Sequence, residues 1–300
     1  MSNKNYTKKI INDYCVLDTE TTGLSAYYDE IIEIGILRVR DNQIVDSYSQ
    51  LIKPKHEIDE FITSLTGITN EMVKNMPSIK EVKNDVLSFI GDDVILGHNT
   101  SFDIRFLNAG FETELPNEYM DTMQFARKLF PELSHHRLSD LVACLGLSNN
   151  EHRSIADCIS TKELYDAEKS VMSQDGLTID DLWIKRTRTH FSSGIDISAI
   201  KPEDVEIDED SFFYNKHVAF TGTLEKMRRE DAMQIVVNLG GILDKSVKKS
   251  TNYLILGNND YNAILKGKKS SKHKKAEELK MNGQDIEIID ELTFYDILEN

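Results

Sequence analysis

The stretch that decides the fold lies near the N-terminus, where residues 14–24 read YCVLDTETTGL. The apolar run at its start predicts a buried strand, and Asp18 and Glu20 follow that run directly. Residues two apart on a strand point to the same face, so the two carboxylates are expected side by side. A hard cation such as Mg²⁺ relieves the repulsion between two such carboxylates. The alternative is a solvated turn, since an Asp-x-Glu triplet arises easily by chance among 51 acidic residues.

Strands and helices alternate around this stretch up to about residue 173. A turn at Asp41 and Asn42 joins two of the predicted strands, and Gly110 is expected to end one of the helices. The predicted strands are IIEIGILRVR (31–40), IVDSYSQLI (44–52) and DVILGH (93–98), and the predicted helices are SIKEVKNDVLSFI (78–90), SFDIRFLNAG (101–110) and ADCISTKELYDAEKSVM (156–172). Because some strands are consecutive and others are separated by helices, the fold class is α/β with a mixed sheet.

A third acidic residue, Asp103, follows the short strand at 93–98 within the sequence HNTSFDIRF. It is expected in the first turn of a helix, where an acid is favoured electrostatically. The alternative to a functional role is a capping box, because Thr100 and Asp103 have the spacing of that motif.

A histidine and a fourth acid occur in HRSIAD at residues 152–157. Five residues on an ideal helix rotate by about 500°, so His152 and Asp157 cannot share a helix face. We therefore expect His152 in the loop before the helix and Asp157 in its first turn. The alternatives are a helix cap formed by Ser154 and Asp157, and a histidine that is simply exposed on the surface.

Together these segments resemble the DEDDh family of 3′→5′ exonucleases, which includes the proofreading epsilon subunit of bacterial replicases. DTETTGL matches the first motif of that family, HNTSFDIRFL the second and HRSIAD the third. The His-x4-Asp spacing is that of the histidine subclass, whereas the sister subclass has Tyr-x3-Asp and this chain has Arg153 at that position. The resemblance covers about residues 12–173 and implies a ribonuclease H-like fold.

The resemblance also implies a mechanism and its residues. Two divalent metal ions, Mg²⁺ or Mn²⁺, would be held by four carboxylates, with Asp18 as the bridging ligand and His152 as the general base. Residues of the first two motifs would contact the terminal nucleotide, and SLTGIT (64–69) would lie near the bound 3′ end. The metal-binding residues would be Asp18, Glu20, Asp103 and Asp157, and the substrate-binding residues Thr21, Thr22 and Phe102.

The C-terminal part of the chain, residues 212–300, resembles a BRCT domain of the type found in bacterial NAD-dependent DNA ligases. The resemblance rests on FTGTL (220–224), LGG (239–241) and STNYLILG (250–257), with Phe294 where many BRCT domains have tryptophan. It implies a parallel four-stranded sheet and a phosphate-binding pocket. The pocket residues would be Thr221, Gly222 and Lys272. The alternative is that the first two form a tight turn and that the lysine is solvated.

The periodicity fades between the two domains. Residues 176–211 are therefore predicted to be an acidic linker between an exonuclease domain at 1–175 and the BRCT domain. The segment from Gln174 to Ile179 resembles peptides that bind sliding clamps, and the alternative is a helix C-cap at Gly176. Six lysines between residues 266 and 275 favour attachment to DNA, with a solvated loop as the alternative.

The net charge of −16 is unevenly distributed, because residues 1–211 carry 21 basic and 38 acidic residues and residues 212–300 carry 14 and 13. An acidic domain repels phosphate groups unless bound metal ions compensate its charge. Cys15, Cys144 and Cys158 form no CxxC pair, which fits a reducing cytoplasm. Neither a signal peptide nor a membrane span is apparent, so we expect a cytoplasmic protein without a membrane partner.

Hydrolysis at DNA 3′ ends is the expected function, with release of nucleoside monophosphates during replication proofreading or repair. The expected partners are a single-stranded DNA 3′ end and a replicative polymerase or sliding clamp, and the BRCT domain would tether the enzyme to DNA or to a protein. One alternative keeps the mechanism and trims RNA 3′ ends, since the three motifs do not discriminate a 2′-hydroxyl. Another is a non-catalytic scaffold, which the complete set of four acids and the histidine disfavours.

Overall fold

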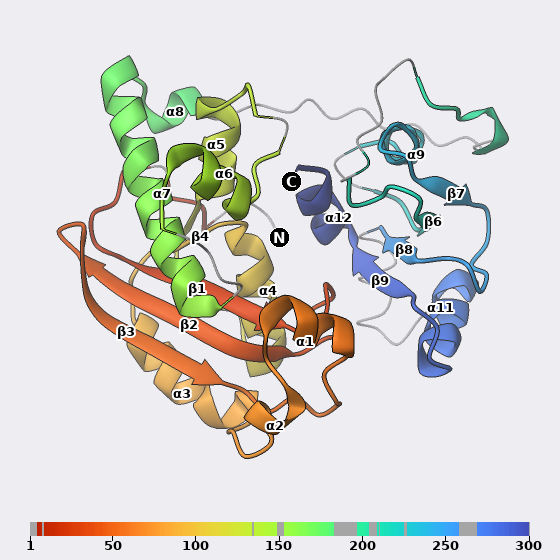
Figure 1. The fold of residues 1–300 in the computed structure, drawn as a ribbon, viewed down its shortest axis with the longest axis horizontal. Coiled ribbons are helices and arrows are strands. Elements are labelled where there is room, and N and C mark those ends of the chain that lie inside the picture. Colours follow the sequence, from red (N-terminus) through yellow and green to blue (C-terminus); the bar gives the residue numbers. More distant parts are fainter. Residues whose placement is uncertain are drawn as a thin grey trace. The chain divides into compact units, whose positions relative to one another are not determined.

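The computed structural model describes residues 5–7, 9–133, 135–148, 153–182, 197–203, 209, 211–224, 227–257 and 269–299. The chain divides into two compact units (Figure 1), which are Met1–Ile184 with Glu299–Asn300 (unit 1) and Lys185–Leu298 (unit 2). Each unit has its own sheet. Within the described part of the chain, no helix combines the length and the apolar character that crossing a membrane requires.

Unit 1 is built on a five-stranded sheet in the order β3-β2-β1-β4-β5. Its strands are β1 (Tyr14–Thr21), β2 (Ile31–Arg40), β3 (Gln43–Leu51), β4 (Ile95–Gly97) and β5 (Tyr119–Asp121). The first three are antiparallel neighbours, whereas β4 pairs parallel with β1 and β5 pairs parallel with β4. The predicted mixed sheet is therefore confirmed. Because β1 extends through Asp18 and Glu20, the solvated-turn alternative is wrong for these residues.

Helices cover both faces of this sheet, as Figure 1 shows. On one face, α3 (Ile79–Ile90) and α4 (Thr100–Phe111) share a core with Cys15 and Leu17 of β1. On the other face, α5 (Thr122–Leu129) and α7 (Ser154–Asp175) share a core with Tyr14 and Val16. Burial of alternate residues on both faces explains why the first half of β1 is uninterruptedly apolar. The other α-helices that unit 1 shows in its described residues are α1 (Glu60–Thr66), α2 (Asn70–Val73), α6 (Leu138–Leu145) and α8 (Ile179–Leu182).

Gly110 does not end its helix, contrary to the sequence prediction. Helix α4 continues to Phe111 and ends at Glu112, which adopts the left-handed conformation with φ 53°. The glycine instead allows α3 and α4 to approach each other, because a Cβ at this position would lie 2.7 Å from Cγ1 of Ile79.

A second glycine brings the start of α7 against the sheet. Gly35 of β2 is the register partner of Asp18, and a Cβ on Gly35 would lie 2.6–2.7 Å from backbone and side-chain atoms of Ser154. One turn into α7, the Cys158 thiol lies 3.4 Å from the carbonyl oxygen of Gly35 and 3.6 Å from that of Val16. The first turn of α7 therefore lies directly over the middle of β1 and β2.

The segment that resembles a clamp-binding peptide forms the C-terminal end of α7 and the residues that follow it. Gly176 is the C-cap of α7, with φ 66°, so the capping alternative is confirmed. Ile179 and Leu182 are buried in the same core as Met172, and Leu177 packs against that core. The structure argues against a clamp-binding peptide here, because the apolar side chains that would dock are already used in unit 1. Residues 177–182 are part of this unit and not of a linker.

Unit 2 contains a parallel four-stranded sheet in the order β7-β6-β8-β9, which confirms the prediction. Its described elements are η2 (Ile197–Ala199), β6 (His217–Thr221), α9 (Arg229–Asn238), β7 (Ile242–Asp244), β8 (Tyr253–Leu256), α11 (Ser271–Met281), β9 (Glu287–Asp290) and α12 (Glu291–Glu299). Phe294 is fully buried and meets Phe220 edge-on, with ring centroids 5.4 Å apart. A phenylalanine thus fills the core at the position where many BRCT domains have tryptophan.

Replacement of Gly35 should separate α7 from the sheet. The added methyl group of Gly35→Ala meets Ser154 backbone atoms that cannot rotate away, so we expect the free energy of unfolding to fall by about 1–3 kcal/mol. Urea denaturation followed by circular dichroism measures this loss. Ser47→Ala on the exposed strand β3 is the control and should change stability by less than about 0.5 kcal/mol. Equal stability of the two variants would show that this contact relaxes freely.

Candidate metal centre

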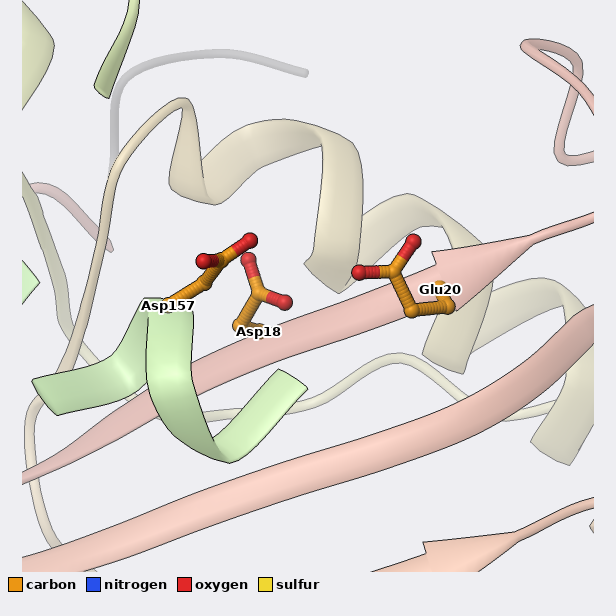
Figure 2. A group of neighbouring side chains, drawn as sticks. All are labelled: Asp18, Glu20 and Asp157. Carbon is orange, nitrogen blue, oxygen red and sulfur yellow. The ribbon is translucent and has the colours of Figure 1, made fainter. Parts of the chain in front are cut away.

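Three carboxylates meet on one face of the sheet in unit 1. Asp18 and Glu20 project from β1, and Asp157 projects from the first turn of α7, as Figure 2 shows. One ligand oxygen from each lies within 4.8 Å of the others. Strand alternation places both β1 acids on the face that α7 covers, because Tyr14 and Val16 of the same face pack in the α7 core. The sequence prediction for these three residues agrees with this geometry.

The fourth predicted ligand, Asp103, reaches the site from the other face of the sheet. It is buried in the first turn of α4, and its Oδ1 accepts hydrogen bonds from the backbone N–H of Thr19 (2.9 Å) and from the Thr19 hydroxyl (2.7 Å). Thr19 lies between the two β1 acids and points the opposite way. The DTE triplet therefore contacts both helix-bearing faces, with its outer residues toward α7 and its middle residue toward α4.

Burial and mutual repulsion raise the pKa values of Asp18, Glu20 and Asp103. Burial raises the pKa of Asp18 well above its usual range, and the carboxylates of Asp103 and Glu20 add to the effect. Burial, followed by Asp157 and Glu33, raises the pKa of Glu20 to about 8. Burial also raises the pKa of Asp103 to about 7, although the hydrogen bonds from Thr19 oppose it. Without a cation, the cluster binds protons near neutral pH.

This cluster fits a divalent cation of the Mg²⁺ or Mn²⁺ type. All the contributing atoms are carboxylate oxygens, which are the ligands that hard cations prefer. Their separation leaves room for ions at the usual oxygen distance of about 2.0–2.6 Å. A bound cation also replaces the protons that the raised pKa values indicate, which removes the repulsion inside the cluster.

Neither Thr100 nor Ser154 caps its helix, so both capping alternatives are wrong. Helix α4 is preceded by Asn99 as its N-cap, and Thr100 is its first helical residue, with its hydroxyl donating to the carbonyl of Met120 at 2.6 Å. Ser154 is likewise the first helical residue of α7 and not its cap. A capping side chain must precede the helix, and these hydroxyls lie one position too late.

The general base predicted at His152 lies outside the described residues, and its role stays a prediction. A different histidine, His98, lies in the second motif, and its environment excludes it from that role. Its Nε2 lies 2.8 Å from the carbonyl of His136, and its Nδ1 lies 2.9 Å from the Thr122 hydroxyl. Burial lowers the pKa of His98 to about 4, so its ring is neutral and both nitrogens have partners.

The three predicted substrate-binding residues lie close in sequence to the predicted metal ligands, and all three make contacts within the protein. The Thr21 hydroxyl donates to the carbonyl of Gly23 at 2.7 Å, and the Thr22 hydroxyl accepts from the backbone N–H of Glu30 at 2.9 Å. Phe102 packs against Phe106, with ring centroids 4.7 Å apart. Their contact with a nucleotide stays a prediction.

Sequence reasoning missed Glu33 of β2, which holds the start of α7. This residue is only 2% exposed, and its carboxylate accepts from Arg153 Nη2 (2.6 Å), Arg153 Nε (3.1 Å) and the backbone N–H of Ser154 (3.0 Å). Burial alone would raise the pKa of Glu33, but these hydrogen bonds outweigh burial and hold it below the usual value. A charged residue inside the apolar run IIEIGIL was the available signal.

The residues of the predicted phosphate pocket come together in unit 2. The Thr221 hydroxyl lies 3.1 Å from that of Ser270, Gly222 has φ 75°, and Lys272 Nζ donates to the carbonyl of Phe220 at 2.7 Å. Burial, with a smaller effect of Arg229, lowers the pKa of Lys272. These contacts exclude the alternative of a fully solvated lysine.

Two lysines of the basic segment that precedes and enters α11 are engaged with acids. Lys269 forms an ion pair with Glu277 at 2.5 Å, and Lys275 forms one with Glu278 at 2.8 Å. Each of these charges is thus compensated locally, which weakens the case for DNA attachment through this segment. Lys266 and Lys268 lie outside the described residues.

Two family models match the chain: the one described as Exonuclease matches residues 15–165, and the one described as BRCA1 C Terminus (BRCT) domain matches residues 208–281. A PolC-type DNA polymerase III of Latilactobacillus sakei is 42% identical over 163 residues, which cover 52% of this chain and 11% of that protein. The PolC-type polymerase of Bacillus subtilis is 38% identical over 176 residues, which cover 55% of this chain and 12% of that protein. The chain therefore spans about a tenth of the length of these curated relatives.

Among solved structures, exonuclease X in complex with 5′ overhanging duplex DNA is 30% identical, with a TM-score of 0.46 and coverage of 56% of this chain and 96% of that chain. E. coli exonuclease I in complex with a dT13 oligonucleotide is 18% identical, with a TM-score of 0.49. The match covers 55% of this chain and 43% of that chain.

The raised pKa values predict how stability changes with pH when no metal is present. The pKa of Glu20 rises from 4.5 to about 8, so its protonated form favours the folded state and this stabilisation is lost as pH rises through about 8. We expect the melting temperature of the metal-free protein to fall between about pH 5 and pH 8, and Mg²⁺ or Mn²⁺ to raise it more at the higher pH. Calorimetry with and without EDTA measures both trends.

Glu20→Gln should flatten this pH dependence and reduce the stabilisation by metal, because the amide neither ionises nor replaces a carboxylate ligand. Glu71→Gln on the exposed surface of α2 is the matched control and should leave both unchanged. A Glu20→Gln profile that coincides with the wild-type profile would show that Glu20 is not part of the coupled cluster.

Proposed function

We propose that this chain, which belongs to the exonuclease family that matches its residues 15–165, hydrolyses phosphodiester bonds at DNA 3′ ends and releases nucleoside monophosphates. The observation that carries the proposal is the convergence of Asp18, Glu20 and Asp157 within 4.8 Å. Acids that repel one another in a partly buried site destabilise the fold unless they bind cations, so their assembly on one strand and one helix start favours a catalytic site.

The protein groups have distinct roles in this proposal. Asp18, Glu20 and Asp157 would hold the divalent ions, and Asp103 would complete the ligand set from the α4 side. Such ions, when bound, lower the pKa of an attacking water and stabilise the leaving 3′-oxygen. Glu33 orients the start of α7 through Arg153 and Ser154, which keeps Asp157 directed at β1. His152 would accept the proton of the attacking water, since its ordinary pKa lies near neutrality.

Exposed apolar side chains on α1 support a single-stranded substrate. Phe61 is 71% exposed and Leu65 is 47% exposed, and residues four apart on a helix lie on the same side. An adjoining side of α1 packs through Ile62 against Ile32 of β2, beside the end of β1 where the carboxylates lie. Bases of a single strand stack on an aromatic side chain such as Phe61 without sequence preference, and Leu65 adds apolar surface beside it.

We further propose that unit 2 tethers the enzyme by binding a phosphate group. Lys272 lies against the C-terminal end of β6 and uses one of its three N–H donors on the Phe220 carbonyl. The remaining donors, together with the Thr221 hydroxyl and the backbone N–H of Gly222, suit phosphate oxygens. The PolC-type relatives are DNA polymerases, which supports a replication or repair context and DNA in preference to RNA.

The hydrolytic activity is tested with a 5′-labelled single-stranded oligonucleotide at neutral pH. We expect stepwise shortening from the 3′ end with Mg²⁺ or Mn²⁺ and none with EDTA. Asp18→Ala should abolish shortening while circular dichroism shows a folded protein, and His152→Ala should slow it by about 10²–10⁴-fold. An oligonucleotide that stays intact with both metals would contradict the proposed activity, and a matched RNA oligonucleotide tests the alternative substrate.

The tether is tested by Lys272→Met in the full chain. Loss of a charge-assisted contact should weaken binding to DNA with a terminal phosphate by about 10-fold or more, measured by fluorescence anisotropy against dephosphorylated DNA. Hydrolysis of a short oligonucleotide should stay within about three-fold of wild type, because its ends reach unit 1 without a tether. Lys275→Met, which removes a lysine paired with Glu278, is the matched control. Equal effects of the two variants would contradict a specific pocket.

A further inference from the structure

Two turns lie side by side at one edge of the sheet in unit 1. Strands β4 and β5 pair in parallel, with Gly97 opposite Asp121, so the chain leaves both strands at the same place. After β4 the chain passes through His98 and Asn99 into α4, which carries Asp103 one helical turn later. After β5 it enters α5 directly at Thr122.

The β5–α5 turn holds the β4–α4 turn through four contacts, one of which joins the Thr122 hydroxyl to the carbonyl of Gly97 at 3.2 Å. The carboxylate of Asp121 accepts from the backbone N–H of Asn99 at 2.9 Å. The Thr122 hydroxyl lies 2.9 Å from Nδ1 of His98. In the opposite direction, the Thr100 hydroxyl donates to the carbonyl of Met120 at 2.6 Å. Consecutive residues of one turn are thus fixed to consecutive residues of the other.

The start of α4 needs these contacts because its own sequence does not fix it. Asn99 adopts the left-handed conformation with φ 66°, which asparagine tolerates better than most residues with a side chain, and it makes no side-chain cap hydrogen bond to α4. Asp121 and Thr122 are both buried, so water cannot replace their hydrogen bonds. The neighbouring turn therefore fixes the residue that precedes α4 through hydrogen bonds from outside the helix.

We infer that Asp121 and Thr122 are positioning residues of the metal centre, which they serve by setting where α4 starts and hence where the Asp103 carboxylate lies. The inference rests on the proposed function, since it assigns Asp103 to the ligand set. A helix moves as a rigid body over one turn, so a shift at Asn99 reaches Asp103 almost undiminished. The 2.7 Å contact between Asp103 and the Thr19 hydroxyl tolerates little displacement.

The test compares disruptive and conservative variants of the full chain. Asp121→Ala and Thr122→Val remove the holding groups, whereas Asp121→Asn and Thr122→Ser retain an acceptor and a hydroxyl. We expect the Mn²⁺ concentration for half-maximal hydrolysis of a 5′-labelled oligonucleotide to rise by about 10-fold or more in the disruptive variants. The conservative variants should stay within about three-fold of wild type, and KM for the oligonucleotide should change little in all four.

A matched control separates positioning from general destabilisation. Asn117 precedes β5, is also buried, and donates to the carbonyls of Gly91 (2.9 Å) and Asp93 (2.8 Å), at the other end of the β4–β5 pair. Asn117→Ala should lower the melting temperature without changing the half-maximal Mn²⁺ concentration. The inference is overturned if Asn117→Ala shifts the Mn²⁺ requirement as much as Asp121→Ala, or if folded Asp121→Ala and Thr122→Val both retain the wild-type requirement.

A second readout distinguishes this inference from the proposed function. Electron paramagnetic resonance of free Mn²⁺ measures metal binding without a substrate. If wild-type protein binds Mn²⁺ but hydrolyses no oligonucleotide, the proposed function fails while positioning is still tested by binding. Weaker Mn²⁺ binding by Asp121→Ala and Thr122→Val than by Asn117→Ala supports the inference in that case, and equal binding overturns it.

Discussion

Mutual repulsion among closely spaced carboxylates, two half-buried and one buried, is the constraint on which unit 1 depends. Asp18, Glu20 and Asp157 lie within 4.8 Å of one another, and burial raises the pKa of the first two. Contacts of neighbouring residues fix the strand and the helix start that carry them. The hydroxyl of Thr19 donates to Asp103, and the absence of a side chain on Gly35 leaves room for the start of α7. Glu33 holds that start through its ion pair with Arg153. The fold therefore keeps the carboxylates together despite their mutual repulsion.

Much of this arrangement follows from local sequence, and the rest depends on distant contacts. Strand alternation alone places Asp18 and Glu20 on one face, and the apolar residues before them identify the strand. The positions of Asp103 and Asp157 in first helical turns were also predicted. The capping interpretations failed because a one-residue difference in helix start decides between a cap and a first-turn residue. Glu33 was missed because its partner Arg153 is 120 residues away, and no local pattern indicates that contact.

The segment after α7 shows why short motifs are ambiguous. Leu177 and Ile179 have the spacing of a docking peptide, but they pack in the core of unit 1. Apolar side chains serve equally well as anchors for a partner and as the last contacts of a domain, so their spacing does not discriminate between these uses. Phe294 is the opposite case. Its departure from the usual tryptophan has no effect on the predicted fold, because an aromatic ring of either kind fills the core.

The hydroxyl of Thr19 has a consequence for how this site can be inherited or transplanted. Thr19 is the middle residue of the Asp18-Thr19-Glu20 triplet and binds no metal in our proposal. It nevertheless links β1 to Asp103 through both its backbone N–H and its hydroxyl. Valine has the same shape but no donor, and serine has the donor but no methyl group to fill the space. The geometry of the site therefore depends on all three residues of the triplet and not only on its two carboxylates. If only the two acids were copied onto a strand of another protein, the contact with Thr19 that positions Asp103 beside them would be missing.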